Sequence, residues 1–130
     1  ADYGLIVDAG EVEALRRLGD APITVVNLFA LRESAEYPGG EACSGVDAML
    51  RYGATSGARL AAVGGNFVAQ ALPTGAVWGD TDVDWDLIVV ATYPSANAFW
   101  SLLADPEYRQ AFAHRRAAVA RQQVLVGATL

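Results

Sequence analysis

The chain has 130 residues, which suits one domain, and its 53% hydrophobic content is enough to bury a single core. Nine basic against fifteen acidic residues give a net charge of -6, which excludes a broad cationic surface for phosphate groups. We therefore expect a single domain over residues 1–130, with residues 1–20 as an N-terminal helical extension, and no nucleic-acid partner.

Residues 60–79 carry no charge over a length that would cross a bilayer, but polar residues, Pro73 and several glycines interrupt them. This pattern is typical of a buried strand followed by a turn, so we expect no membrane-spanning segment and no membrane partner. The single cysteine, Cys43, has no partner for an internal disulfide, and the N-terminus is acidic where a signal peptide would be basic. We therefore predict a cytoplasmic protein in which Cys43 is a buried, inert thiol.

An apolar residue at about every third position predicts a first helix over residues 9–18. Residues 23–31 are nearly all apolar and rich in β-branched types, which is typical of a central strand covered on both faces. Asn27 is the one strongly polar side chain in this strand. The polar residues 32–42 predict a loop, and helical spacing then predicts a second helix over residues 44–55.

The second half of the chain predicts three more strands and two more helices. Residues 60–72 form a second strand interrupted by two adjacent glycines, and residues 84–93 form a third. Ser95 is a good N-cap for a helix with an apolar stripe, and Pro106 begins another helix that extends to about residue 121. Residues 124–129 form the last strand.

One helix followed by β-α-β-β-α-β describes a ferredoxin-like α+β sandwich with an extra N-terminal helix. The helices of this fold cover only one face of the sheet, whereas the first and third strands are apolar on both faces. An uncovered second face would expose a larger apolar patch than monomers tolerate. We therefore expect a homodimer in which two sheets pack face to face about a twofold axis.

The most regular charge pattern places an acid at every second position: Asp80, Asp82, Asp84 and Asp86. Such residues lie about 6.7 Å apart on one face of a strand, and each repulsion is only about 0.6 kcal/mol in water, so a solvated strand entrance tolerates them. A calcium loop of EF-hand type would need Gly in place of Trp85 and Glu in place of Ala91. We expect no metal site, and keep Asp86, beside the apolar run, as a candidate pocket acid, with a plain hairpin acid as the alternative.

The last predicted helix carries an arginine on its buried stripe, which consists of Tyr108, Phe112, Arg115 and Val119. Arg116 turns toward solvent. A buried guanidinium needs a partner, which is either structural, such as Asp86 or a terminal helix carbonyl, or the carboxylate or enolate of a ligand. His114 lies on the flank of the stripe, where it is either a structural residue or a general acid or base.

The candidate catalytic residues are therefore His114, Arg115 and Asp86. Further polar or aromatic side chains complete a candidate ligand-binding pocket between sheet and helices: Asn27, Tyr52, Trp85, Tyr93 and Tyr108. Each of these also has a structural interpretation, because Asn27 can bond to a strand and the aromatic side chains can belong to an ordinary core.

Six short segments occur in an order that is typical of a known family: residues 25–31, 51–53, 63–66, 85–95, 105–109 and 114–119. Through these six segments the chain resembles the family catalogued as domain of unknown function 1330, and the resemblance covers all but the first twenty residues. The resemblance implies the dimeric α+β barrel fold. Relatives in that superfamily include cofactor-free oxygenases, muconolactone-type isomerases, polyketide cyclases, haem-degrading enzymes and peroxidases, and fold analogy does not select among them.

Two function classes follow from the residues and the resemblance together. The first is a small-molecule enzyme without a tightly bound cofactor, of cyclase, isomerase or cofactor-free oxygenase type, that uses acid/base chemistry and enolate stabilisation on an oxygenated or aromatic metabolite. The second is a non-catalytic dimer that binds a small ligand or another partner. A third, haem-binding or haem-degrading, is disfavoured because His114 lies far from Trp85 in sequence. We expect a small ligand, anionic in the Arg115 hypothesis, and no cofactor.

Overall fold

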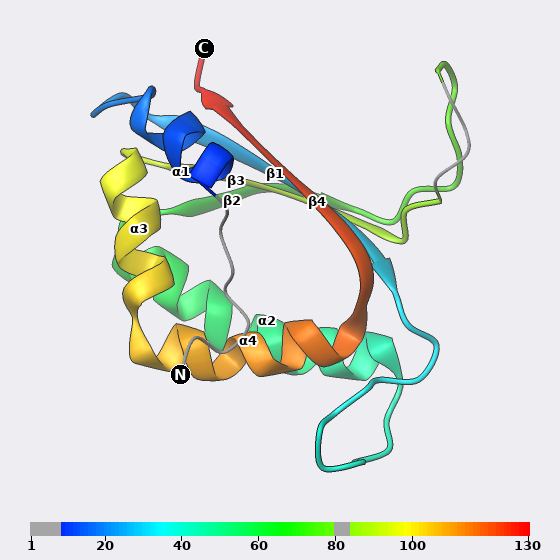
Figure 1. Cartoon of the computed structure of the whole chain (residues 1–130). Coiled ribbons are helices and arrows are strands. Elements are labelled where there is room, and N and C mark those ends of the chain that lie inside the picture. Colours follow the sequence, from blue (N-terminus) through cyan, green and yellow to red (C-terminus); the bar gives the residue numbers. More distant parts are fainter. Residues whose placement is uncertain (1–8, 80–83) are drawn as a thin grey trace.

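The computed structural model describes residues 9–79 and 84–130 (Figure 1). Its elements follow in chain order: helix α1 Ala9–Arg16, strand β1 Ile23–Leu31, helix α2 Gly45–Ala62, strand β2 Asn66–Ala71, strand β3 Leu87–Tyr93, helix α3 Ala96–Ala104, helix α4 Pro106–Ala118 and strand β4 Val119–Ala128. The predicted α+β class and the ferredoxin-like element order, with two consecutive helices before the last strand, are confirmed.

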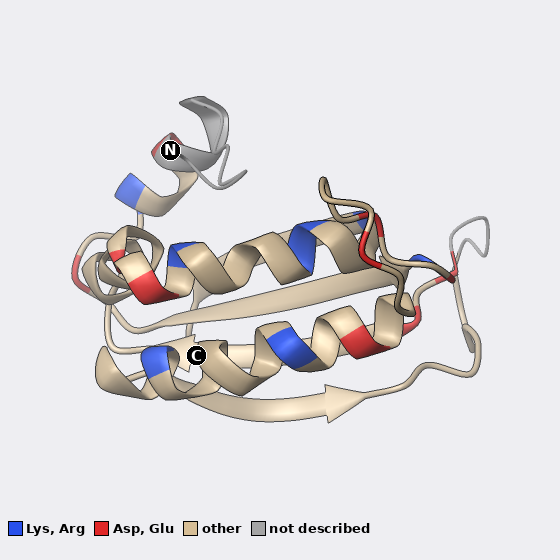
Figure 2. Ribbon diagram, turned by 90° about the horizontal axis from the view of Figure 1, so that it is seen from below, with Lys and Arg blue, Asp and Glu red and all other residues tan. Residues whose placement is uncertain are grey.

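The four strands form one antiparallel sheet in the order β2-β3-β1-β4. The central strand β1 places Asn27 opposite Val89 of β3 and Val124 of β4. Helices α2, α3 and α4 all lie on one side of the sheet (Figure 1), and α2 and α4 run beside each other across it (Figure 2). None of the described helices has the length and apolar character that crossing a bilayer requires.

The buried core lies between this sheet face and the helices. Ile23 and Val25 of β1 and Leu102 of α3 are its largest fully buried side chains. The β1 residues of opposite parity, such as Val26 and Leu28, are only partly buried. Charged positions gather on helices and loops and are nearly absent from the strands (Figure 2). One face of the sheet is therefore a core, and the other is an apolar surface.

Several predicted boundaries are wrong. Helix α2 extends to Ala62, so the first residues of the predicted second strand are helical, and Leu60 packs into the core at 5% exposure. The run of alanines and leucine favours a helix as much as a buried strand, and a glycine with φ +85°, Gly64, then turns the chain into β2. Strand β3 begins at Leu87 and not at residue 84.

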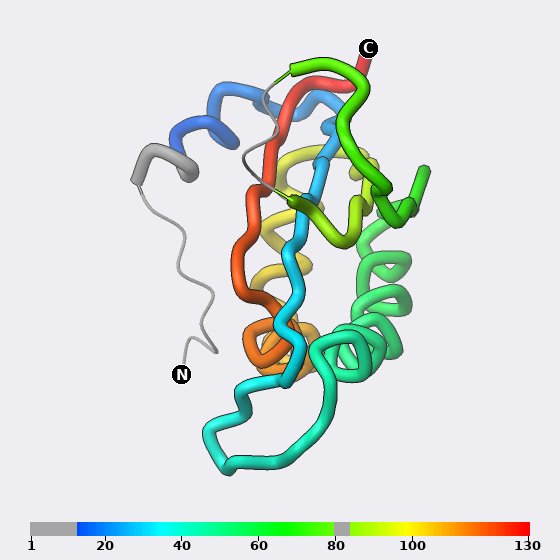
Figure 3. The backbone as a smooth tube through the Cα atoms, turned by 90° about the vertical axis from the view of Figure 1, so that its right-hand side faces the viewer, coloured from blue at the N-terminus to red at the C-terminus, as the bar shows by residue number. Residues whose placement is uncertain are grey.

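The end of α4 also differs from the prediction. The helix ends at Ala118, three residues before the predicted end, and β4 begins at Val119 without a loop. Residues 121–123 look helical in isolation, but they pair with residues 28–30 of β1 in the sheet. Strand β4 then curves from the end of α4 up along β1 (Figure 3). The strand hydrogen bonds override local helix propensity at this junction.

Gly45, the first residue of α2, packs directly against the backbone of the preceding loop. A Cβ atom there would collide with the backbone carbonyl group of Arg32. We expect Gly45→Ala to lower the free energy of unfolding by about 1 to 3 kcal/mol, the usual cost of overpacking, as measured by urea unfolding. Gly53→Ala is the matched control, since no neighbour lies within 4 Å of a Cβ at that helical position, and it should stabilise by about 0.5 to 1 kcal/mol. Equal stability of the two variants would contradict this packing.

Candidate functional site

A cavity of about 1410 Å³ lies between the sheet and the helices. Most of its lining is apolar and includes Val25, Phe29, Val89, Ala91, Leu102 and Phe112. Exposed lining side chains on α2, β2 and β4, such as Leu50, Phe67 and Val124, form its rim. The apolar walls suit an organic ligand, and the volume exceeds that of most small-molecule sites.

Arg115 of α4 is the buried charge of this cavity, with only 7% of its surface exposed. The other charged residues of the lining are more exposed: Arg32, Glu33 and Asp86. Its Nε and Nη2 atoms both donate to Oε1 of Gln122, at 3.1 and 2.8 Å. Nη1 donates to the hydroxyl of Tyr52 at 3.2 Å, and Nη2 also reaches Oδ1 of Asn27 at 3.5 Å. Every one of these acceptors is neutral.

Aromatic rings surround the same guanidinium. Its central carbon lies 4.7 Å from the ring centre of Phe29, 5.1 Å from that of Phe112 and 5.5 Å from that of Tyr52. Cation–π contacts of this kind contribute about 0.5 to 2 kcal/mol each, the higher values when the cation is desolvated. The rings therefore offset part of the hydration that Arg115 loses on burial.

No carboxylate of the described residues forms an ion pair with Arg115. The ion pairs of residues 9–79 and 84–130 use other arginines, all of them closer to the surface: Arg17, Arg32, Arg51 and Arg59. Burial lowers the pKa of Arg115, but the facing hydroxyls of Tyr52 and Tyr108 more than offset that effect, so the guanidinium stays charged. The cavity thus contains a buried positive charge held by neutral groups.

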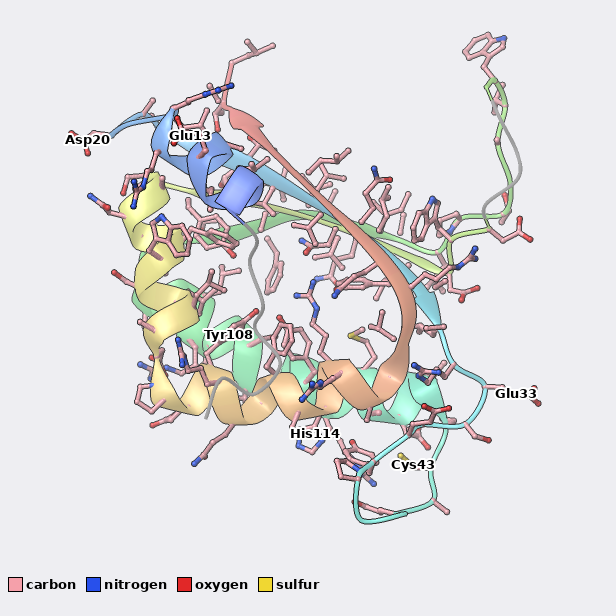
Figure 4. The ribbon with its side chains drawn as sticks, in the orientation of Figure 1. Glu13, Asp20, Glu33, Cys43, Tyr108 and His114 are labelled. Atoms are coloured by element: carbon pink, nitrogen blue, oxygen red, sulfur yellow. The ribbon has the colours of Figure 1, made fainter. Side chains whose placement is uncertain are left out.

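Three tyrosines add hydroxyl groups to the lining. The hydroxyls of Tyr52 and Tyr108 lie 2.8 Å apart, and Tyr108 points from α4 toward the sheet (Figure 4). Burial raises the pKa of Tyr108 and of Tyr93, and the nearby Arg115 only partly opposes this effect. Both phenols are therefore protonated at neutral pH, and they are hydrogen-bond donors and weak acids but not bases.

Asn27 and Gln122 hold Arg115 from the two strands β1 and β4. The amide nitrogen of Asn27 donates to the carbonyl oxygen of Val89 at 3.2 Å, which turns its Oδ1 toward Arg115. Gln122 is opposite Phe29 in the sheet and is largely exposed. Sequence reasoning missed Gln122 because the last helix was predicted to reach residue 121. A strand that begins at Val119 places Gln122, Val124 and Val126 on the cavity face.

Two predicted site residues lie outside the cavity. His114 points away from the sheet (Figure 4), and its Nδ1 atom lies 2.6 Å from the hydroxyl of Tyr37. Trp85 lies before the first residue of β3, with the guanidinium of Arg121 5.9 Å from its ring centre. Neither residue lines the cavity around Arg115.

Asp86 is not the partner of Arg115. It is exposed at the rim, where its Oδ2 accepts a hydrogen bond from the backbone of Leu31 at 2.7 Å. Its backbone N–H donates to Phe29 at 2.7 Å, so Asp86 extends the pairing of β1 and β3. This placement supports the alternative interpretation of Asp86 as a hairpin acid.

The remaining predicted positions either do not line the cavity or lie outside the described residues. Cys43 is partly exposed in the loop before α2, which corrects the prediction of a buried thiol. Asp80 and Asp82 lie outside the described residues, and Asp84 is exposed. Within residues 9–79 and 84–130, no group of three or more His, Cys, Asp or Glu side chains has the spacing of a metal site.

Comparison with known proteins decides the family. The model of the family described as domain of unknown function DUF1330 matches residues 44–129. The chain belongs to this family. The resemblance of the six sequence segments to DUF1330 is thereby confirmed. No curated protein matches the chain.

Solved structures extend the comparison beyond the DUF1330 match. The chain is 35% identical to the RPA0582 protein of unknown function from Rhodopseudomonas palustris, with 96% of each chain covered and a TM-score of 0.84. It is 19% identical to SnoaB, a cofactor-independent oxygenase from Streptomyces nogalater, with 85% of this chain and 94% of that chain covered and a TM-score of 0.55. A dimeric ferredoxin-like protein of unknown function from Thermobifida fusca is 18% identical, with 86% and 94% covered and a TM-score of 0.54. The last two share the fold.

The raised pKa values of Tyr93 and Tyr108 make stability depend on pH in the alkaline range. Both phenols bind their protons more tightly in the folded than in the unfolded protein, where the pKa is about 10. Their contribution to stability is therefore complete below about pH 10 and is lost as the pH rises through the folded-state values. We expect absorbance at about 295 nm to show fewer than all five tyrosines ionised before alkaline unfolding.

Phenylalanine variants isolate the two groups. Tyr93→Phe and Tyr108→Phe should each make the free energy of unfolding fall less steeply above about pH 10. If all five tyrosines ionise while the protein remains folded, the two hydroxyls are not buried as the structure places them.

Proposed function

We propose that this protein is a small-molecule enzyme without a tightly bound cofactor, which stabilises the enolate of an oxygenated or aromatic metabolite in the cavity. The observation that carries the proposal is the buried Arg115, which faces the cavity and has no carboxylate partner among the described residues. An unpaired buried charge is costly in a purely structural role. A ligand that develops negative charge supplies the missing partner.

The geometry supports electrostatic stabilisation of that charge. Arg115 has five N–H donors in a planar fork, and its apolar surroundings strengthen each interaction relative to water. The protonated hydroxyls of Tyr93 and Tyr108 add donors nearby. Tyr93 lines the same cavity, where its hydroxyl is a donor for a ligand oxygen. An enolate oxygen near Arg115 would meet charge and donors together.

Among the described residues, no carboxylate or histidine side chain contacts Arg115 to accept the proton that leaves the substrate. His114 faces Tyr37 and Asp86 lies at the rim, while the buried phenols keep their protons. This arrangement favours substrates that are acidic themselves, such as 1,3-dicarbonyl compounds or phenols. Such an anion can undergo cyclisation, isomerisation or reaction with oxygen, and SnoaB, which shares the fold, is a cofactor-independent oxygenase.

The same missing base supports the alternative function, a non-catalytic site that binds an anionic ligand without converting it. Turnover of an acidic dicarbonyl compound, or its absence despite binding, separates the two. The haem alternative has no histidine in this cavity, because the single histidine of the chain, His114, is held by Tyr37 outside it.

The Arg115→Met variant tests the proposal, because Met keeps most of the stem volume and removes the charge. The probe is benzoylacetone, an aromatic 1,3-dicarbonyl compound whose enolate is followed by absorbance across a pH series. We expect the apparent pKa of the bound probe to be about one unit or more higher in the variant, equivalent to about 1.4 kcal/mol of lost enolate stabilisation. The free energy of unfolding should change by less than about 1.5 kcal/mol, since no described carboxylate is left unpaired.

Arg116→Met is the control for this experiment. Arg116 is the next residue of α4 and is exposed, so its loss should leave both the pKa of the probe and stability nearly unchanged. Similar effects at positions 115 and 116 would contradict the proposal. So would a stability loss of about 3 kcal/mol or more at Arg115 alone, which would assign it a purely structural role.

We also propose that the protein is a homodimer, joined through the sheet face that α2, α3 and α4 leave open. Side chains of β1 and β3 on this face are apolar and only partly buried: Val26, Leu28, Ile88 and Val90. Leu125 of β4 is 50% exposed on the same face. Solved proteins of this fold from Thermobifida fusca and Bacteroides fragilis are described as dimeric. A face of this kind suits a second copy that presents the same residues.

Light scattering at micromolar concentration should give twice the mass of one chain. Val90→Asp places a charge in the centre of the open face, opposite Val26, and should shift the protein to the mass of one chain. Gln110→Asp adds the same charge at an exposed position of α4 and should leave the mass doubled. A monomeric wild-type protein would refute the dimer.

A further inference from the structure

We infer that the side chain of Gln122 occupies the anion subsite of the cavity, and that the carboxylate or enolate of the ligand displaces it from Arg115. This inference rests on the proposed function, because it locates the ligand's charged oxygen in the same site. It assigns Gln122 a specificity role: a neutral residue that fills the place of an anion without cancelling the charge.

One edge of the Arg115 guanidinium, formed by its Nε–H and Nη2–H groups, faces the side chain of Gln122. Nε and Nη2 both donate to the single oxygen Oε1 of Gln122, at 3.1 and 2.8 Å. These two N–H groups are parallel, and this edge is one that binds carboxylates in a bidentate manner. A neutral amide offers one oxygen where a carboxylate offers two. The edge is therefore only partly used by the protein itself.

The other donors of Arg115 are held by groups that are fixed in the core. The hydroxyl of Tyr52 accepts a hydrogen bond from Nη1, and it also forms a hydrogen bond of 2.8 Å with the hydroxyl of the buried Tyr108. Oδ1 of Asn27 accepts a hydrogen bond from Nη2, and the amide nitrogen of Asn27 donates to the carbonyl oxygen of Val89. Moving either side chain would break a second hydrogen bond. The ligand therefore cannot take these positions without disturbing the core.

Gln122 differs from these two residues in its freedom to move. It is largely exposed on β4, although its Oε1 reaches Arg115, and its nitrogen forms no hydrogen bond with another described residue. The side chain can rotate toward water, where the solvent satisfies its amide. Exchange of a neutral acceptor for a charged one strengthens both bonds to Arg115, because charge-assisted bonds are about twice as strong as neutral ones.

The apolar lining fixes the rest of the ligand. Phe29, which is opposite Gln122 in the sheet, and Phe112 of α4 flank the guanidinium and leave apolar surface beyond it. A ligand with one anionic oxygen group on a planar apolar body satisfies both parts. We therefore expect the site to prefer small aromatic or unsaturated carboxylates and enolates over neutral amides of the same shape.

The test uses benzoate and its neutral isostere benzamide as probes, with dissociation constants measured by NMR titration. Wild-type protein should bind benzoate at least about tenfold more tightly than benzamide, the equivalent of about 1.4 kcal/mol. Gln122→Ala removes the competing side chain and should tighten benzoate binding by about threefold or more. Gln122→Glu supplies a tethered carboxylate and should weaken benzoate binding by about tenfold or more and abolish the preference over benzamide.

Two further variants serve as controls for the effect of added charge and for the effect of the substitution on the strand. Gln110→Glu adds the same charge at an exposed position of α4 outside the cavity lining, and should leave benzoate affinity within about twofold of wild type. Gln122→Thr retains strand propensity and should behave as Gln122→Ala. Melting curves of all variants confirm that each protein is folded.

The possible outcomes separate this inference from the proposed function. If the Ala and Thr variants bind benzoate more weakly than wild type, Gln122 positions Arg115 and the inference is wrong, while an anion site at Arg115 stands. Undiminished benzoate binding by Gln122→Glu also overturns the inference alone. If wild-type protein binds benzoate no better than benzamide, the proposed function itself fails, and the inference fails with it.

Discussion

The central constraint of this structure is the burial of a positive charge, Arg115, among neutral hydrogen-bond acceptors and aromatic rings. The full desolvation cost of a guanidinium is too large for an apolar cavity, so the fold must replace the lost water. Tyr52, Asn27 and Gln122 supply acceptors from three different elements, and Phe29 and Phe112 supply ring faces. Helix α2, strands β1 and β4 and helix α4 must therefore all be in place before Arg115 can be accommodated.

The start and the end of α4 determine where this charge lies. At its start, Asp105 accepts hydrogen bonds from the backbone of Glu107 and Tyr108 and from the side chain of Arg59 on α2. The backbone bond from Tyr108 is the largest cause of the lowered pKa of Asp105. At its end, β4 follows without a loop, so the chain folds back and brings position 122 opposite position 115. Two local features thus align the buried stripe of α4 with the cavity face of the sheet.

The sequence was sufficient to predict which side chains of a helix are buried, because burial follows the helical period. It was not sufficient to predict contacts between residues that only the pairing of strands and loops brings together. Helical spacing placed Arg115 on the buried side of α4 and Arg116 in solvent, because burial on a helix repeats about every 3.6 residues. The partners of Arg115 could not be read in this way: Gln122 belongs to a strand whose start is set by pairing with β1. His114 is next to Arg115 in sequence but faces a loop, and only the position of Tyr37 reveals this.

The chemistry of the cavity follows from which groups keep their protons. Arg115 is charged and the buried phenols of Tyr93 and Tyr108 are neutral, so every polar group that is firmly held there favours negative charge on a ligand. A cavity of this kind lowers the energy of an enolate without removing the proton itself. Catalysis and simple binding then use the same residues and differ in the ligand: an anion with a low-energy onward reaction is converted, and one without it is retained. The reactivity of the bound anion therefore decides between the two functions.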